Sequence, residues 1–209
     1  MNLPVLAYVA EFAFILPVTA GIYRWKKLSK PVKVLTIFFC FSLLIVAGEE
    51  TLRRMHIHNL FLGKIHQVIE IQCFFYLYWK YSSSRVFKDG IQYAGMFYLL
   101  FWVVTQVYFD DPDKFNEIIA TVANFALIVV SVLSLYELAQ QATIPLHKYT
   151  MFWISAAIII YSSGTIIIFS FSNSILALGN TYFSAFWHIN WMLIIIVNSM
   201  FARSFWCKM

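Results

Sequence analysis

Residues 154–169, ISAAIIIYSSGTIIIF, decide the fold of this chain. Apolar or small side chains cover every side of this stretch. A strand of a transmembrane barrel would instead alternate apolar and polar residues over about 10 positions. Apolarity on all sides is typical of a helix that is surrounded by lipid. The stretch therefore predicts a helix that crosses a membrane.

The rest of the chain repeats this character. A helix that crosses a bilayer needs about 20 mostly apolar residues, and seven such segments occur. They lie near residues 3–23, 34–52, 60–79, 91–109, 118–139, 149–171 and 182–202. We therefore expect an all-α membrane protein, a seven-transmembrane-helix bundle, with a single transmembrane domain over residues 1–209. The sequence leaves open whether Pro17 bends the first helix.

The composition excludes a water-soluble domain. Hydrophobic residues make up 61% of the 209 residues, and charged residues only 12%. A soluble domain of this length buries roughly 70% of the surface of its unfolded chain and still needs a polar exterior. These residues cannot supply such an exterior, so we expect lipid to surround the helices.

The charges between the segments predict the orientation of the chain. Residues 24–33 hold five of the fifteen lysines and arginines, whereas residues 110–114 are mainly acidic. Because basic connections stay in the cytoplasm, we expect the N-terminus outside and the C-terminus in the cytoplasm. The basic residues on the cytoplasmic side are then Arg24, Lys26, Lys27, Lys30, Lys33, Lys80, Arg85, Lys88, Lys148, Arg203 and Lys208. The net charge of +5 follows from this topology, and we expect no nucleic-acid partner.

Strongly polar residues within the segments gather in the half nearest the outside. A charged side chain at the bilayer centre costs at least about 2.5–3.5 kcal/mol on insertion scales, so such residues normally face a bundle interior or an aqueous cavity. This asymmetry predicts a polar basin, open to the outside, that binds a small ligand, a lipid headgroup or an ion. The candidate ligand-binding residues are Glu11, His66, Glu70, Asn124, Tyr161 and His188.

The third segment contributes most to this basin. Asn59, Gly63, His66, Glu70 and Cys73 recur every three or four positions. They therefore share one face of a helix. His66 and Glu70 are four residues apart, so we expect their side chains to touch.

Two acidic residues precede two basic residues at the outer end of the second segment. Glu49 and Glu50 stand four positions before Arg53 and Arg54. This spacing permits ion pairs along an extended helix end. We expect these pairs to lie close to water, where an ion pair contributes little to stability.

Three interpretations of the basin remain open at the level of sequence. Polar side chains between membrane helices often only hold a bundle together, at about 0.6 kcal/mol each. Ionisable residues in such helices can instead mark a functional site. A metal site is the third hypothesis, with His66, Glu70 and His188 as candidates, because zinc and iron accept imidazole and carboxylate ligands. The spacing of these residues identifies no cofactor.

Two known classes of seven-helix protein can be excluded. A retinal protein needs a lysine in its last helix, and none lies between Lys148 and Lys208. Membrane hydrolases of the ceramidase and progestin-receptor type carry a His-x-x-x-His pattern there. In this chain, the position four residues after His188 is occupied by Met192.

Loose aromatic and polar landmarks occur along the whole chain. They are Leu16-Pro17 followed by residues 21–29, IHQVIE at 65–70, FWI at 152–154 with YSSG at 161–164, and WHI at 187–189 with Asn198. Together they resemble a group of small seven-helix inner-membrane proteins of Bacteroidota. The resemblance implies a location in the bacterial cytoplasmic membrane and a sensory or regulatory role beside a sensor kinase or a transcriptional regulator. It assigns no catalytic residue.

The sequence as a whole favours a receptor-like or regulatory membrane protein without enzymatic activity. A receptor must shift between conformations and pass the change to a partner. Few residues follow the last segment, so we expect a signalling partner to dock on the basic cytoplasmic face. Membrane lipids are the other expected partners. The alternative is an integral-membrane, metal-dependent enzyme or a small transporter that uses the same basin.

Overall fold

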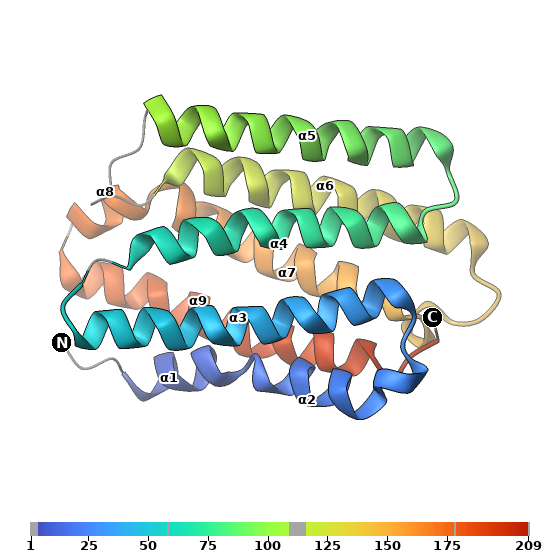
Figure 1. Ribbon diagram of the computed structural model, residues 1–209, viewed down its shortest axis with the longest axis horizontal. Helices are drawn as coiled ribbons and strands as arrows, with labels where there is room; N and C mark the ends of the chain where they lie inside the picture. The colour runs from blue at the N-terminus through green and yellow to red at the C-terminus, as the bar shows by residue number, and fades with distance from the viewer. Residues whose placement is uncertain (1–3, 58, 109–115, 178, 209) are drawn as a thin grey trace.

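The computed structural model describes residues 4–57, 59–108, 116–177 and 179–208. Its helices lie side by side in one elongated bundle (Figure 1). In chain order they are α1 (Val5–Phe12), α2 (Ile15–Arg24), η1 (Trp25–Lys27), α3 (Lys30–Arg54), α4 (Leu60–Tyr81), α5 (Arg85–Tyr108), α6 (Glu117–Gln141), η2 (Leu146–Lys148), α7 (Thr150–Ser170), α8 (Ser172–Ala177) and α9 (Asn180–Ser204). Within the described residues the extended pairing is limited to one isolated bridge, between Tyr149 and Lys208. The predicted all-α class is therefore confirmed.

The long helices run alternately in opposite directions along the bundle (Figure 1). α4 packs between α3 and α5 and also contacts α6, while α9 packs against α7, α1 and α2. We name the two ends of the bundle by residues of α3 and α4. The Arg54 end is where α3 ends and α4 begins, and α1 also begins there. The Tyr81 end is where α4 ends, and α9 ends there too (Figure 1).

Several helices have the length and apolarity of membrane spans. Much of their surface is exposed: in α5, only 22% of the most apolar 18-residue window is buried. Soluble monomers rarely expose apolar patches larger than a few hundred Å², so lipid is the solvent that suits this surface. Within the described residues, six helical segments are long and apolar enough to cross a membrane: Val5–Lys27, Lys30–Arg54, Arg85–Tyr108, Glu117–Gln141, Thr150–Ser170 and Ser184–Ser204. This is the architecture of an integral membrane protein.

α4, which corresponds to the segment predicted at 60–79, is not among these six. With 22 residues it is long enough to cross a bilayer. Its mean hydropathy is lower because Lys64, His66, Glu70 and Lys80 interrupt the apolar residues. The polar residues that predicted a basin beside this helix therefore also give it a lower mean hydropathy than the other six segments.

The observed helices extend beyond several of the predicted segments. The segment predicted at 34–52 is α3, which begins at Lys30 and ends at Arg54, and the segment predicted at 91–109 is α5, which begins at Arg85. Apolar residues mark only the part of a helix that lies in hydrocarbon, and a helix can continue into the interface with charged residues. The acidic connection at 110–114 lies outside the described residues.

The first predicted helix is interrupted near its middle. Pro17 has no N–H to donate to the Ala13 carbonyl, and its ring crowds that carbonyl. α1 accordingly ends at Phe12 and α2 begins at Ile15. The Leu16 N–H donates to the Ala13 carbonyl instead, at 3.0 Å. The question that the sequence left open is thus answered: the helix breaks one turn before the proline.

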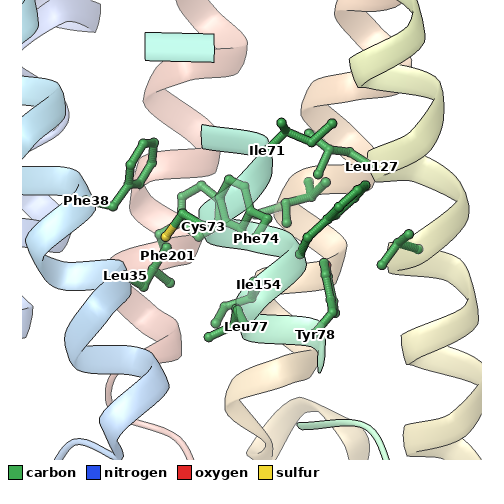
Figure 2. Close-up of a cluster of buried hydrophobic side chains, with 14 of the residues drawn as sticks. Leu35, Phe38, Ile71, Cys73, Phe74, Leu77, Tyr78, Leu127, Ile154 and Phe201 are labelled. Atoms are coloured by element: carbon green, nitrogen blue, oxygen red, sulfur yellow. The ribbon is translucent and has the colours of Figure 1, made fainter. Parts of the chain in front are cut away.

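Buried side chains pack densely in the half of the bundle toward the Tyr81 end. Figure 2 shows Leu77, Tyr78, Phe74 and Ile154 within this cluster, and each is 0–2% exposed. The Tyr78 hydroxyl shares a 2.7 Å hydrogen bond with Ser131 Oγ and donates to Ser155 Oγ at 3.2 Å. This junction ties α4 to α6 and α7, which positions the other half of α4.

Candidate functional site

A cavity of about 400 Å³ lies among α3, α4, α6, α7 and α9. We call it the larger cavity. It begins at the Arg54 end, where Asn59 and Asn116 line it, and reaches Leu127. Leu127 is ten residues beyond the start of α6, which corresponds to a depth of about 15 Å. The bundle is therefore hollow in the half where the sequence predicted a polar basin.

One face of α4 forms the longest wall of the larger cavity. The residues of this helix that line it are Leu60, Gly63, Lys64, His66, Gln67, Glu70 and Ile71, which recur with the period of a helix. Other residues of the same helix turn apolar side chains to the opposite side, where these side chains are exposed. The predicted shared face of the third segment is therefore the face that turns toward the cavity.

Glu70 lies where the larger cavity meets a second one. It lines both cavities, and among the described residues no hydrogen bond or ion pair reaches its carboxylate. The rings of Tyr98 and Tyr161 lie within electrostatic reach of this carboxylate. An acidic group without a partner in such surroundings is costly. Its position is the most unusual feature of the bundle interior.

His66 is held by α3 and not by Glu70. Its Nε2 lies 2.8 Å from Ser42 Oγ, and its ring stacks on Phe38 at a centroid distance of 5.4 Å. The Ser42 hydroxyl donates its single proton to the Phe38 carbonyl, so Oγ accepts from Nε2–H of the histidine. Nδ1 is then the free acceptor. Within the described residues no hydrogen bond links His66 to Glu70, although their spacing allowed the two side chains to touch, because Ser42 of the neighbouring helix holds the Nε2 atom.

Two more candidates line the larger cavity from α6 and α7. Asn124 donates Nδ2 to the Ala120 carbonyl at 2.9 Å, so its amide oxygen stays available as an acceptor. Tyr161 lines both cavities. Of the six residues predicted to form the basin, His66, Glu70, Asn124 and Tyr161 thus surround one cavity.

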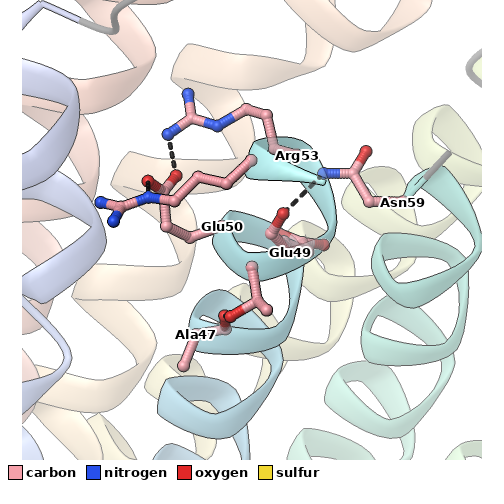
Figure 3. A network of polar contacts seen from close by, with 7 residues as sticks. Ala47, Glu49, Glu50, Arg53 and Asn59 are labelled. Carbon is pink, nitrogen blue, oxygen red and sulfur yellow. Dashed lines mark hydrogen bonds and ion pairs between the residues drawn. The ribbon is translucent and has the colours of Figure 1, made fainter. Parts of the chain in front are cut away.

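The mouth of the larger cavity is shaped by the end of α3 (Figure 3). Glu50 pairs with both Arg53 and Arg54, as the sequence allowed. Glu49 pairs with neither, and its backbone carbonyl accepts a hydrogen bond from Asn59 Nδ2 at 3.1 Å. Glu49 lines the cavity instead. A Cβ atom on Gly63 would lie 3.4 Å from Glu49 Oε1, an ordinary contact distance, so this carboxylate lies against α4.

Glu11 and His188 do not line the larger cavity. Glu11, on α1, lies within electrostatic reach of Glu49 and Arg53. The His188 Nδ1 is 2.6 Å from the Ser184 carbonyl of its own helix, and its ring packs edge-on against Trp191. The two residues therefore flank the site.

Metal ligands do not gather in the part of the chain that the structure describes. No group of three or more His, Cys, Asp and Glu side chains there could hold a metal ion. Of the three metal candidates, His66 and Glu70 share a cavity, but His188 bonds to its own helix.

The second cavity was not predicted from the sequence. This smaller cavity, of about 120 Å³, lies between aromatic rings of Phe38, Phe74 and Phe201. Ser162 and Asn198 also line it. Asn198 was the main polar residue of the inner half in the sequence, and it is the signal that could have pointed to this cavity.

Comparison with known proteins found no matching family model, no similar curated protein and no similar solved structure.

Proposed function

We propose that this chain is a receptor-like membrane protein of seven transmembrane helices that binds a small ligand in the larger cavity. The position of Glu70 is the observation that supports this most. Its carboxylate faces two cavities in the bundle interior and has no partner among the described residues. Ionisable residues within membrane helices generally mark a functional site, and side chains that merely hold helices together are expected to have partners.

In this proposal α4 is the seventh transmembrane helix. The side of α4 away from the cavity carries Phe61, Ile65, Ile69 and Tyr76, which are 36–51% exposed. Phe61, Ile65 and Ile69 follow one another at intervals of four residues, so they lie on one apolar stripe of the helix. An apolar stripe toward lipid and a polar stripe toward a cavity account for the modest mean hydropathy of α4.

The proposed orientation puts the Tyr81 end in the cytoplasm. The basic residues concentrate there, as the positive-inside rule requires. Several of them lie over aromatic rings: Arg24 is 4.9 Å from the Trp206 ring, and a Lys80 ammonium is 4.5 Å from the Trp79 ring. Aromatic rings and cations of this kind are typical of a membrane interface. The larger cavity then opens to the outside.

A receptor also needs an output. The basic face at the Tyr81 end is the surface on which we propose that a signalling partner docks, by attraction to acidic groups. Ligand binding at Glu70 would bias the packing of α4 against α6, and the Tyr78 junction connects these helices near that face. The ligand must therefore bind the signalling conformation more tightly than the resting one.

Cysteine accessibility tests the site and the orientation together. Cys40, Cys73 and Cys207 are replaced first, and single cysteines are then placed at Gln67, in the larger cavity, or at Lys26, on the basic face. A membrane-impermeant maleimide added to intact cells should label Gln67→Cys but not Lys26→Cys. After permeabilisation it should label both.

A buried position supplies the matched control. Ser131 is 0% exposed, so Ser131→Cys should not react in either condition. Labelling of Lys26→Cys from outside would overturn the orientation. A Gln67→Cys variant that stays unlabelled after permeabilisation would show that the cavity is closed to small molecules, and the ligand-binding proposal would then fail.

A further inference from the structure

Two residues that line the smaller cavity carry buried polar atoms for which the described residues supply no hydrogen-bond partner. Asn198, 1% exposed, donates Nδ2 to the Ile194 carbonyl at 2.8 Å, while its Oδ1 is buried without a partner. The Ser162 hydroxyl oxygen, in a residue that is 0% exposed, also lacks one. A buried polar atom without a partner costs about 1–3 kcal/mol. A ligand with N–H donors would remove this cost.

The charge around the two cavities is suited to a cation. Glu70 lines both cavities, and the larger one is also lined by Glu49 and by Lys64, so two carboxylates face one ammonium group there. Neither carboxylate has an ion-pair partner within the described residues. An anion would be repelled by both groups, whereas a cation would be attracted to the interior first by Glu49 and then by Glu70.

The walls of the smaller cavity select the kind of cation. Phe38, Phe74 and Phe201 line this cavity with rings that contact one another, because the Phe74 ring centroid is 6.0 Å from that of Phe38 and 5.8 Å from that of Phe201. Aromatic faces attract ammonium groups within about 6 Å of a ring centroid, and cages of such rings bind quaternary ammonium ligands. A hard metal cation would instead need about six or more oxygen ligands. Aromatic carbon occupies much of the wall where those oxygens would have to be.

We propose that the two cavities together bind a small organic ammonium ion. This inference rests on the proposed function, because it names the ligand class of the same site. The nitrogen lies against Glu70 in the smaller cavity and donates to Asn198 Oδ1, while the rest of the molecule extends past Tyr161 into the larger cavity. An apolar cavity of about 150 Å³ accepts benzene, so 120 Å³ suffices for an ammonium group and a few carbon atoms.

Two sources could supply this chemistry, a free amine or an ethanolamine lipid headgroup. The full chain is therefore purified into nanodiscs of phosphatidylglycerol, which carries no ammonium group. Binding is measured by calorimetry with butylamine, tetramethylammonium, 1-butanol, butyrate and magnesium chloride. We expect butylamine and tetramethylammonium to bind, and the neutral, anionic and metal probes not to bind.

Variants identify the carboxylate responsible. Glu70→Gln should weaken butylamine binding roughly tenfold to a hundredfold, as expected for the loss of a charge-assisted contact. Glu70→Asp should keep the preference for butylamine over butanol. Glu50→Gln is the matched control, because Glu50 pairs with Arg53 and Arg54 outside the cavity, and its affinity should equal that of the wild type.

The lipid composition separates the two sources. Phosphatidylethanolamine replaces half of the phosphatidylglycerol in one sample, and an uncharged glycolipid replaces it in a second, because the loss of anionic lipid alone lowers the concentration of a cation at the membrane. If phosphatidylethanolamine weakens butylamine binding more than the glycolipid does, the headgroup competes for the site. If the two replacements have the same effect, the ligand is a free amine. Either result supports the ammonium site.

Three outcomes would overturn it: no probe binds, butanol or butyrate binds as tightly as butylamine, or Glu70→Gln binds butylamine like the wild type. The labelling of Gln67→Cys separates this failure from failure of the proposed function. If that cysteine is labelled, the larger cavity remains a ligand site of another chemistry. If it is not, both proposals fail.

Discussion

The two halves of α4 differ in packing although they belong to one helix. From Leu60 to Glu70 no residue is buried, and the polar face lines a cavity of about 400 Å³. From Ile71 to Tyr78 six of the eight residues are 0–9% exposed. The tyrosine that ends this half has its hydroxyl bonded to two serines, whereas the glutamate that ends the other half has no partner among the described residues.

This difference suggests a division of labour along the helix. The Tyr81 half anchors α4 to α3, α6 and α7 with dense packing and satisfied polar groups, and it can therefore hold Glu70 in place. The Arg54 half leaves space and polar atoms available. A cavity with unsatisfied groups reduces stability, so we expect the dense half to provide most of the stability of the bundle. The predictions that follow compare the two halves directly.

The largest difference should come from truncating an apolar side chain. Leu77 is 0% exposed and Ile69 is 38% exposed, and a change to alanine removes three carbons from each. Leu77→Ala leaves a void among packed neighbours and should lower the free energy of unfolding by about 2 kcal/mol, at the low end for such changes because lipid is as apolar as the core. Ile69→Ala should cost less than about 0.5 kcal/mol. Unfolding by SDS titration measures both, and equal losses would refute the division.

The hydroxyl groups of two tyrosines supply a finer comparison. Tyr78→Phe removes the hydrogen bonds to Ser131 and Ser155 and should cost about 0.6–1 kcal/mol. Tyr161→Phe, in the cavity wall, should leave the unfolding free energy unchanged within error, because its hydroxyl makes no hydrogen bond to another described residue. The same titration checks both variants. A larger loss for Tyr161→Phe would show that the cavity wall is structural.

The two glutamates at the end of α3 should differ by a smaller amount. Glu50→Gln removes the ion pairs with Arg53 and Arg54 and should cost about 0.5 kcal/mol, less at high salt because these groups are partly exposed. Glu49→Gln removes no ion pair and keeps the backbone bond to Asn59. At 20 mM salt the thermal unfolding midpoint of Glu50→Gln should therefore lie below that of the wild type, and at 500 mM salt the two midpoints should be closer. The midpoint of Glu49→Gln should match that of the wild type at both salt concentrations. A salt-dependent loss in Glu49→Gln would contradict this assignment.

Glu70→Gln should have the smallest effect on stability. The carboxylate has no partner to lose among the described residues, and an amide is cheaper to bury than an unpaired charge. We expect the unfolding free energy in the absence of ligand to be unchanged within error or slightly raised. SDS titration of the ligand-free protein measures it. A strongly destabilised variant would mean that Glu70 is a structural group, and the contrast between the halves would be lost.

Some parts of this fold could be read from residue types alone. The stretch at residues 154–169 predicts a membrane helix because lipid contact and helix contact both require apolar side chains, so no partner needs to be known. The same reasoning applies to five other segments. It was weaker for α4, where the polar residues that line the cavity lower the mean hydropathy below that of the other spans.

The positions of the site residues divide in a similar way. Helical periodicity placed His66 and Glu70 on one face of α4, and both lie on the larger cavity. Periodicity could not tell that Ser42, 24 residues earlier, would take the histidine ring, or that His188 would bond to its own helix. Such choices depend on the distance between helices and on side-chain competition, and neither is encoded in spacing along one helix.

The helical class, the apolar spans, the uneven distribution of basic residues and the polar face of α4 can all be derived from the amino-acid sequence. These features follow from the bilayer and from 3.6 residues per turn, which act on each segment separately. Three further features depend on the folded bundle: the helix breaks before Pro17, Glu70 has no partner among the described residues, and Phe38, Phe74 and Phe201 line a second cavity beside it. Those features arise from packing between helices. Side chains that are distant in the sequence meet there, and only some of their conformations fit together.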